Sequence, residues 1–186
     1  MASTRRTVPL VLPDLSVTLT TDRGVFARDA VDPGTKLLLL DGPVPPPAGD
    51  LLDLGCGYGP IAVALARRAP GARVWAVDVN RRALDLCAAN AEAAQVEVRT
   101  ATPDEVPDGV RFAGIWSNPP VRVGKGPLHR LLAAWLDRLT PEGRAALVVH
   151  RHLGADSLAR WLEESGWPTT RTTSRMGYRL LEVRRP

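Results

Sequence analysis

The sequence predicts an α/β fold with a mostly parallel, doubly wound sheet of seven strands, helices on both faces and an antiparallel C-terminal strand pair. Short apolar segments typical of buried strands alternate with longer amphipathic segments typical of helices from residue 50 onward. The tail has two further strand-like segments around Met176-Gly177. A length of 186 residues, 45% of them hydrophobic, suits a single domain with its own core.

The elements follow one another in a βαβαβ order after a proline-rich connector at 41–49, which holds four prolines and two glycines. Upstream of it, 16–20 has the alternation of a strand and 35–40 suits a short helix. We therefore expect an N-terminal flap and connector at 1–48 and the α/β domain at 49–186. The expected strands are 50–54, 73–77, 96–100, 112–116, 145–149, 169–174 and 178–183, and the expected helices are 60–69, 80–95, 127–139 and 156–165.

Composition restricts the class of protein. No apolar run approaches the ~20 residues of a membrane span, and the N-terminus lacks the apolar core of a secretory signal, so we expect a cytoplasmic protein without a membrane partner. The two cysteines, Cys56 and Cys87, have no metal-site or disulfide-framework spacing, and the three histidines have no metal-ligand spacing, so no metal is expected. A net charge of +4 permits a polyanionic partner without requiring one, and no pattern indicates an oligomeric state.

A glycine-rich loop joins the strand at 50–54 to the following helix. It has the spacing D-x-G-x-G-x-G from Asp53 to Gly59, whereas the dinucleotide fingerprint would put its third glycine at Pro60. Glycines allow tight turns and let a ligand approach the backbone closely. The spacing and the leading acid favour S-adenosylmethionine over a nicotinamide, and the expected contacts are Gly55, Cys56, Gly57 and Gly59. The alternative is a loop whose glycines only close a tight turn.

Two carboxylates accompany this loop at the ends of successive strands. We expect Asp53 to help hold the ammonium group of the cofactor and Asp78, followed by Val79, to accept hydrogen bonds from the ribose hydroxyls. In the alternative interpretation Asp78 only caps the next helix.

The segment Ser117-Asn118-Pro119-Pro120 follows the fourth strand, which ends beside the first in this topology. An amine conjugated to a ring is a poor nucleophile, and acceptors for its two N–H groups favour the pyramidal nitrogen that attacks. The Asn118 side-chain oxygen and the Pro119 carbonyl are suitable acceptors, and the stiff turn preorganises them. The three residues Asn118, Pro119 and Pro120 are therefore the candidate catalytic group, and the alternative is a plain turn capped by Asn118.

These motifs, together with Val77-Asp78-Val79-Asn80, resemble the small-domain class I methyltransferases related to ribosomal RNA small subunit methyltransferase C. The resemblance begins upstream, at Gly24–Arg28 and Asp32-x-Gly34-Thr35, and extends through Gly177-Tyr178-Arg179. It implies a Rossmann-like fold, S-adenosylmethionine as the cofactor, and methylation of the exocyclic N2 amine of a guanine in ribosomal RNA.

The chain departs from this family at three positions. Val121 stands where many relatives have an aromatic residue that stacks on the target base, and Phe26 is the best substitute, although a core role suits it equally. Thr102 stands where the family often has an acid that contacts the adenine amine, with Asp104 two residues on. Ala113 stands where related chains usually have an aspartate ahead of the Asn-Pro-Pro turn.

Basic residues follow the catalytic turn and the fifth expected strand. We expect Arg122, Lys125, Arg130 and Arg151 to form a rim that binds RNA phosphates, and the alternative is an ordinary solvated surface. Val121 also leaves open a protein glutamine amide, another nucleobase or a small-molecule amine as the substrate. A non-catalytic, cofactor-binding accessory subunit is a further hypothesis, and the intact Asn118-Pro119-Pro120 is evidence against it.

Overall fold

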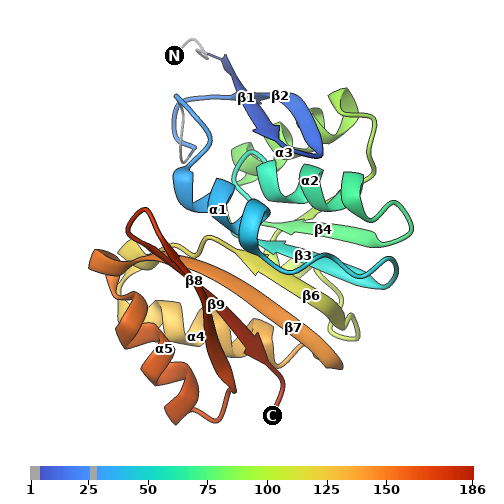
Figure 1. Ribbon diagram of the computed structural model, residues 1–186. Helices are drawn as coiled ribbons and strands as arrows, with labels where there is room; N and C mark the ends of the chain where they lie inside the picture. The colour runs from blue at the N-terminus through green and yellow to red at the C-terminus, as the bar shows by residue number, and fades with distance from the viewer. Residues whose placement is uncertain (1–4, 26–28) are drawn as a thin grey trace.

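The computed structural model describes residues 5–25 and 29–186, and its main sheet has seven strands in the order β5-β4-β3-β6-β7-β9-β8 (Figure 1). The first five of these strands are parallel, and β9 runs antiparallel to both β7 and β8. The predicted fold is therefore confirmed. The strands are β3 Asp50–Leu54, β4 Arg73–Val77, β5 Arg99–Ala101, β6 Phe112–Ser117, β7 Leu139–His150, β8 Thr169–Arg175 and β9 Tyr178–Arg184.

Helices cover both faces of the sheet (Figure 1), and strand alternation explains how each face has its own core. Leu51 faces a cluster with α1, α2 and α3, whereas its neighbour Leu52 faces a second cluster with α4 and α5. The helices are α1 Pro33–Asp41, α2 Pro60–Arg68, α3 Arg81–Ala93, α4 Lys125–Leu136 and α5 Ala155–Glu164, with short 3-10 turns η1 Pro103–Glu105, η2 Val121–Val123 and η3 Arg151–Leu153. No helix of the described segments is long and apolar enough to cross a membrane.

The N-terminal region forms a packed hairpin. Strand β2 (Leu15–Thr21) pairs antiparallel with β1 (Arg6–Leu12), and Leu10 and Leu19 are fully buried in the cluster shared with α2 and α3. The buried Asn90 side chain ties β2 to α3: its Oδ1 accepts from the Thr20 N–H at 2.7 Å and its Nδ2 donates to the Thr20 carbonyl at 2.8 Å. Sequence reasoning found a strand at 16–20 but missed β1.

Three expected boundaries were wrong for identifiable reasons. The expected strand at 96–100 is Arg99–Ala101, because Gln95 adopts a left-handed φ of 56° and the Val96 N–H still bonds to Ala91 in α3. Strand β7 begins at Leu139, six residues before the expected start, through a register shift opposite β6. Helix α4 begins at Lys125, directly after Gly124, whose φ of 94° turns the chain into the helix.

Candidate active site

A cavity of about 800 Å³ opens at the carboxyl ends of β3, β4 and β6. The chain runs from β3 outward to β5 and then returns to β6 on the other side of β3, so the cavity lies where the strand order reverses. Open α/β sheets bind ligands at this position. The cavity lining includes residues of the glycine loop, the end of β4, the turn after β6 and the start of α1, namely Gly55, Cys56, Gly57, Asp78, Val79, Asn118, Pro119, Pro120, Asp32 and Thr35.

The glycines of the loop differ in what they contact. A Cβ built on Gly55, which has a φ of 75° and lines the cavity, would meet nothing within 4 Å, so the backbone there is open to a ligand. Gly59 does not line the cavity, and a Cβ on it would lie 2.4 Å from the Cys87 Sγ, so this glycine allows α2 to pack on α3. A hydrogen bond with Cys87, together with burial, raises the pKa of Cys56, which therefore lines the cavity as a neutral thiol.

Asp53 lies beneath the loop and does not line the cavity. It is fully buried, and its Oδ2 accepts a hydrogen bond from the Ala62 N–H at 2.9 Å in the first turn of α2. Among the described residues its Oδ1 has no hydrogen-bond partner, and burial raises the pKa of Asp53 to about 8. The carboxyl group anchors the helix to the strand, so it is placed to support the loop and not to contact a ligand directly.

Asp78 does line the cavity, at the end of β4. Its Oδ2 accepts from the Gly57 N–H and its Oδ1 from the Asn80 N–H, each at 2.9 Å. Both oxygens retain lone pairs for a ligand. Val79 beside it is 82% exposed, whereas Thr102 is buried outside the cavity wall and its N–H donates to Glu105 Oε2.

Asn118 directly follows β6, and two hydrogen bonds hold the nitrogen of its side-chain amide. Its Nδ2 donates to Asp32 Oδ2 at 2.8 Å and to Thr35 Oγ1 at 3.1 Å. Across 5–25 and 29–186 no residue donates a hydrogen bond to its Oδ1, which leaves this oxygen available to a substrate. The Pro119 carbonyl accepts from the Val121 N–H at 2.8 Å and keeps one lone pair. Sequence reasoning gave no role to Asp32 and Thr35, although the upstream Asp-x-Gly-Thr spacing was a signal.

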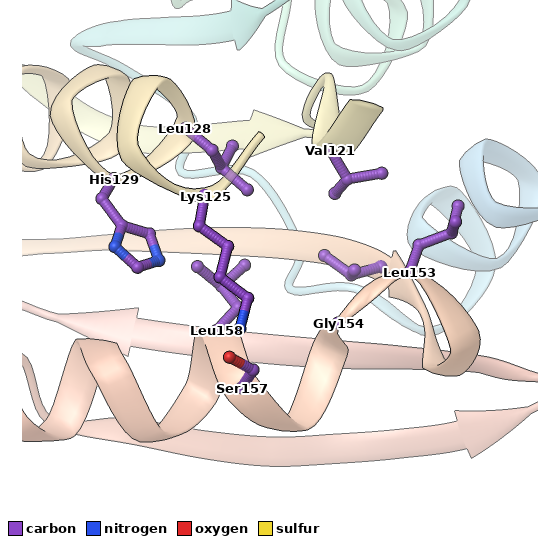
Figure 2. Close-up of a pocket in the computed structure, with 9 residues that line it drawn as sticks. Val121, Lys125, Leu128, His129, Leu153, Gly154, Ser157 and Leu158 are labelled. Atoms are coloured by element: carbon purple, nitrogen blue, oxygen red, sulfur yellow. The ribbon is translucent and has the colours of Figure 1, made fainter. Parts of the chain in front are cut away.

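Two of the expected substrate contacts line the cavity, and the other described ones do not. Arg122 and the half-buried Val121 line it, whereas Arg130 and Arg151 are exposed outside its wall. A smaller cavity adjoins it between α4 and α5, where Lys125 and Ser157 extend toward each other and Val121 and Leu153 lie at one end (Figure 2). Phe26 lies outside the described residues.

Aromatic rings that sequence reasoning did not assign also line the larger cavity. They are His150 at the end of β7, His152 in η3 and Tyr178 at the start of β9. The His150 and Tyr178 rings are perpendicular, with their centroids 4.9 Å apart.

Comparisons with known proteins identify the family of the chain. A family model described as "Methyltransferase small domain" matches residues 16–182. The chain is 32% identical over 187 residues to the uncharacterized protein YbxB of Bacillus subtilis, an alignment that covers 98% of this chain and 93% of that protein. It is 34% identical over 158 residues to ribosomal RNA small subunit methyltransferase C of Shewanella amazonensis, covering 81% of this chain and 46% of that protein.

A solved structure is similar over nearly the whole chain. It is a 16S rRNA N2 methyltransferase of T. thermophilus in complex with AdoMet and guanosine, with a TM-score of 0.82, 26% identity and coverage of 98% of this chain and 51% of that one. The chain thus spans about half the length of the ribosomal RNA methyltransferases that it matches. The comparisons confirm the predicted cofactor, S-adenosylmethionine. The chain belongs to the methyltransferase small-domain family.

Proposed function

We propose that the chain methylates the exocyclic amine of a guanine in ribosomal RNA, with S-adenosylmethionine as the methyl donor. One observation carries the proposal: the Asn118 amide is fixed through its nitrogen while its oxygen stays available, in the same cavity as the glycine loop. The names of the ribosomal RNA methyltransferase relatives and the guanosine in the T. thermophilus neighbour support this substrate class.

The residues that line the cavity fit the cofactor. The volume of about 800 Å³ is within the range of small-molecule sites and leaves room for a substrate group beside the cofactor. The open Gly55 backbone and the Asp78 carboxylate would hold it, the latter by accepting hydrogen bonds from ribose hydroxyls. When bound, S-adenosylmethionine supplies an electrophilic methyl group on a sulfonium.

The catalytic turn would act on the amine. Asn118 Oδ1 and the remaining lone pair of the Pro119 carbonyl accept its two N–H groups and favour a pyramidal nitrogen, whose lone pair is then free to attack. The hydrogen bond from the Val121 N–H holds the Pro119 carbonyl in place. These acceptors are in place before the substrate arrives, so little reorganisation is needed.

The basic rim supports a nucleic-acid substrate. Arg122, Lys125, Arg130 and Arg151 are exposed, and none of them forms an ion pair with another described residue. Arginines elsewhere vary in this respect, because Arg68 and Arg73 are paired with aspartates, whereas Arg99 forms no ion pair within the described residues. Unpaired cations beside the cavity mouth would be available to bind phosphates.

Methyl transfer from labelled S-adenosylmethionine to RNA, protein and small-molecule fractions tests the proposal. The fractions come from cells that lack the gene, and the Asn118→Ala variant is the control for adventitious transfer. We expect label in ribosomal RNA, at a guanine amine once mapped. Label in protein would instead indicate a glutamine amide, and label in small molecules another amine. Cofactor binding without label in any fraction would indicate an accessory subunit.

A further inference from the structure

Three segments that are distant in the sequence meet beside Asn118: the start of α1, the turn after β6 and the start of β9. Asp32, in the segment before α1, accepts the Asn118 Nδ2–H through its Oδ2, across 86 residues of sequence. The same oxygen accepts the Thr35 N–H at 3.0 Å and so caps α1. Tyr178, from the C-terminal hairpin, lies against the first turn of α1: a Cβ on Gly34 would be 2.5 Å from its ring.

The chemistry of Asp32 determines which way the Asn118 amide faces. A carboxylate only accepts hydrogen bonds, so the amide must turn its nitrogen toward Asp32 and its oxygen away. The buried Thr35 hydroxyl, 3.1 Å from the same nitrogen, is the second acceptor. An amide in a site without these acceptors could flip and offer two donors to a substrate amine, which needs acceptors instead.

We infer that Asp32, assisted by Thr35, is a positioning residue that orients the Asn118 amide so that Oδ1 faces the substrate amine. This inference rests on the proposed amino-group methylation at the same site. It gives each named residue of the Asp32-x-Gly34-Thr35 segment a role, because Asp32 and Thr35 hold the amide and Gly34 leaves room for the Tyr178 ring beside the first turn of α1.

Two substitutions separate orientation from helix capping. Asp32→Ser retains a good N-cap residue but has a shorter side chain without the acceptor that reaches Asn118. Asp32→Asn retains an oxygen that can accept from both Thr35 N–H and Asn118 and removes only the charge. The matched control is Asp41→Ser, at the other end of α1, where the carboxylate pairs with Arg175.

We expect Asp32→Ser to lower kcat about tenfold or more, with the cofactor Kd changed by less than about twofold. Asp32→Asn should retain activity within about threefold of the unmodified protein, and Asp41→Ser should match it. An unchanged kcat in Asp32→Ser, or an equal loss in Asp32→Asn, would overturn the inference. So would a loss that appears as weaker cofactor binding, because that result indicates a structural role.

A substrate-free measurement separates this inference from the proposed function. The side-chain amide signals of Asn118, identified by their absence in Asn118→Ala, report its hydrogen bonds in nitrogen–proton NMR spectra. Asp32→Ser should shift these signals and speed the exchange of their protons with water, and Asp41→Ser should leave them in place. Unshifted signals in Asp32→Ser would disprove the contact even if the methylated substrate proves not to be RNA. Shifted signals support it whichever fraction takes up label.

Discussion

The two parts of the cavity that we propose hold the cofactor and the substrate, the cofactor half and the substrate half, are built in different ways. In the cofactor half, Asp78 binds the backbone of Gly57, 21 residues earlier, and of its own neighbour Asn80. In the substrate half, Asn118 depends on a side chain 86 residues away, and the rim is exposed and unpaired among the described residues. The first half is therefore a local property of one βαβ unit, whereas the second depends on tertiary packing that brings Asp32 and Thr35, at the start of α1, to Asn118.

Removing the Asn118 amide should have the largest effect of these changes. The effect should be confined to the substrate half of the cavity. Asn118→Ala is expected to lower kcat on the order of a hundredfold, because the proposed role of its oxygen is to accept a hydrogen bond from the amine during transfer. Cofactor affinity, measured by calorimetry, should stay nearly unchanged. If kcat and cofactor affinity fell together, Asn118 would belong to the cofactor half and the division would fail.

The corresponding change in the cofactor half is Asp78→Ala. If Asp78 accepts two ribose hydroxyls as proposed, with each hydrogen bond worth on the order of 1 kcal/mol, its loss should raise the cofactor Kd at least about tenfold. Asp85→Ala, at an exposed position on the adjoining helix α3, is the matched control and should bind normally. Unchanged affinity in Asp78→Ala would refute the ribose assignment.

The buried Asp53, beneath the glycine loop of the cofactor half, predicts a pH dependence of stability. Its pKa is about 8 in the folded protein and 3.8 ordinarily, so between these values the native state keeps a proton that the unfolded chain releases. The free energy of unfolding contributed by this group therefore falls as pH rises from about 4 to about 8, by at most about 1.4 kcal/mol per pH unit.

Asp53→Asn tests this dependence, since the amide oxygen can still accept from the Ala62 N–H but does not ionise. Urea unfolding at about pH 5 and about pH 8 should show a smaller decline in stability for Asp53→Asn than for the unmodified protein. Parallel declines in both proteins would show that Asp53 is ionised in the fold.

The same contrast explains which features could be predicted from the sequence. Strands β3 and β4 and the glycine loop were found because apolar runs, glycines and acids stand next to one another in the chain. Strand β1 was missed because it contains Pro9, which an edge strand tolerates but which sequence rules count against a strand. The short β5 was misplaced because the chain leaves α3 through a turn at Gln95.

The site residues likewise divide into those that local sequence predicts and those that depend on tertiary packing. Asp78 and Asn118 were identified from local motifs, and both line the cavity. Local spacing did not reveal that Asp53 turns inward beneath the loop, or that Asp32 reaches Asn118, because both facts depend on tertiary packing. The roles of Phe26 and the basic rim stay predictions.

Changes in the basic rim should have the smallest individual effects and leave the cofactor half untouched. If Arg122, Lys125, Arg130 and Arg151 bind phosphates, each single Ala replacement should weaken RNA binding several-fold and reduce the log-log salt slope by about 0.7 to 0.9. Arg99→Ala is the control. Arg99 is an exposed residue of β5, the edge strand opposite β8, and its guanidinium lies over the Trp75 ring. It forms no ion pair within the described chain. Filter binding across a salt series measures both quantities. A flat salt dependence would exclude the rim as a phosphate site, whereas a steep one lost only in the rim variants would place RNA at the substrate half.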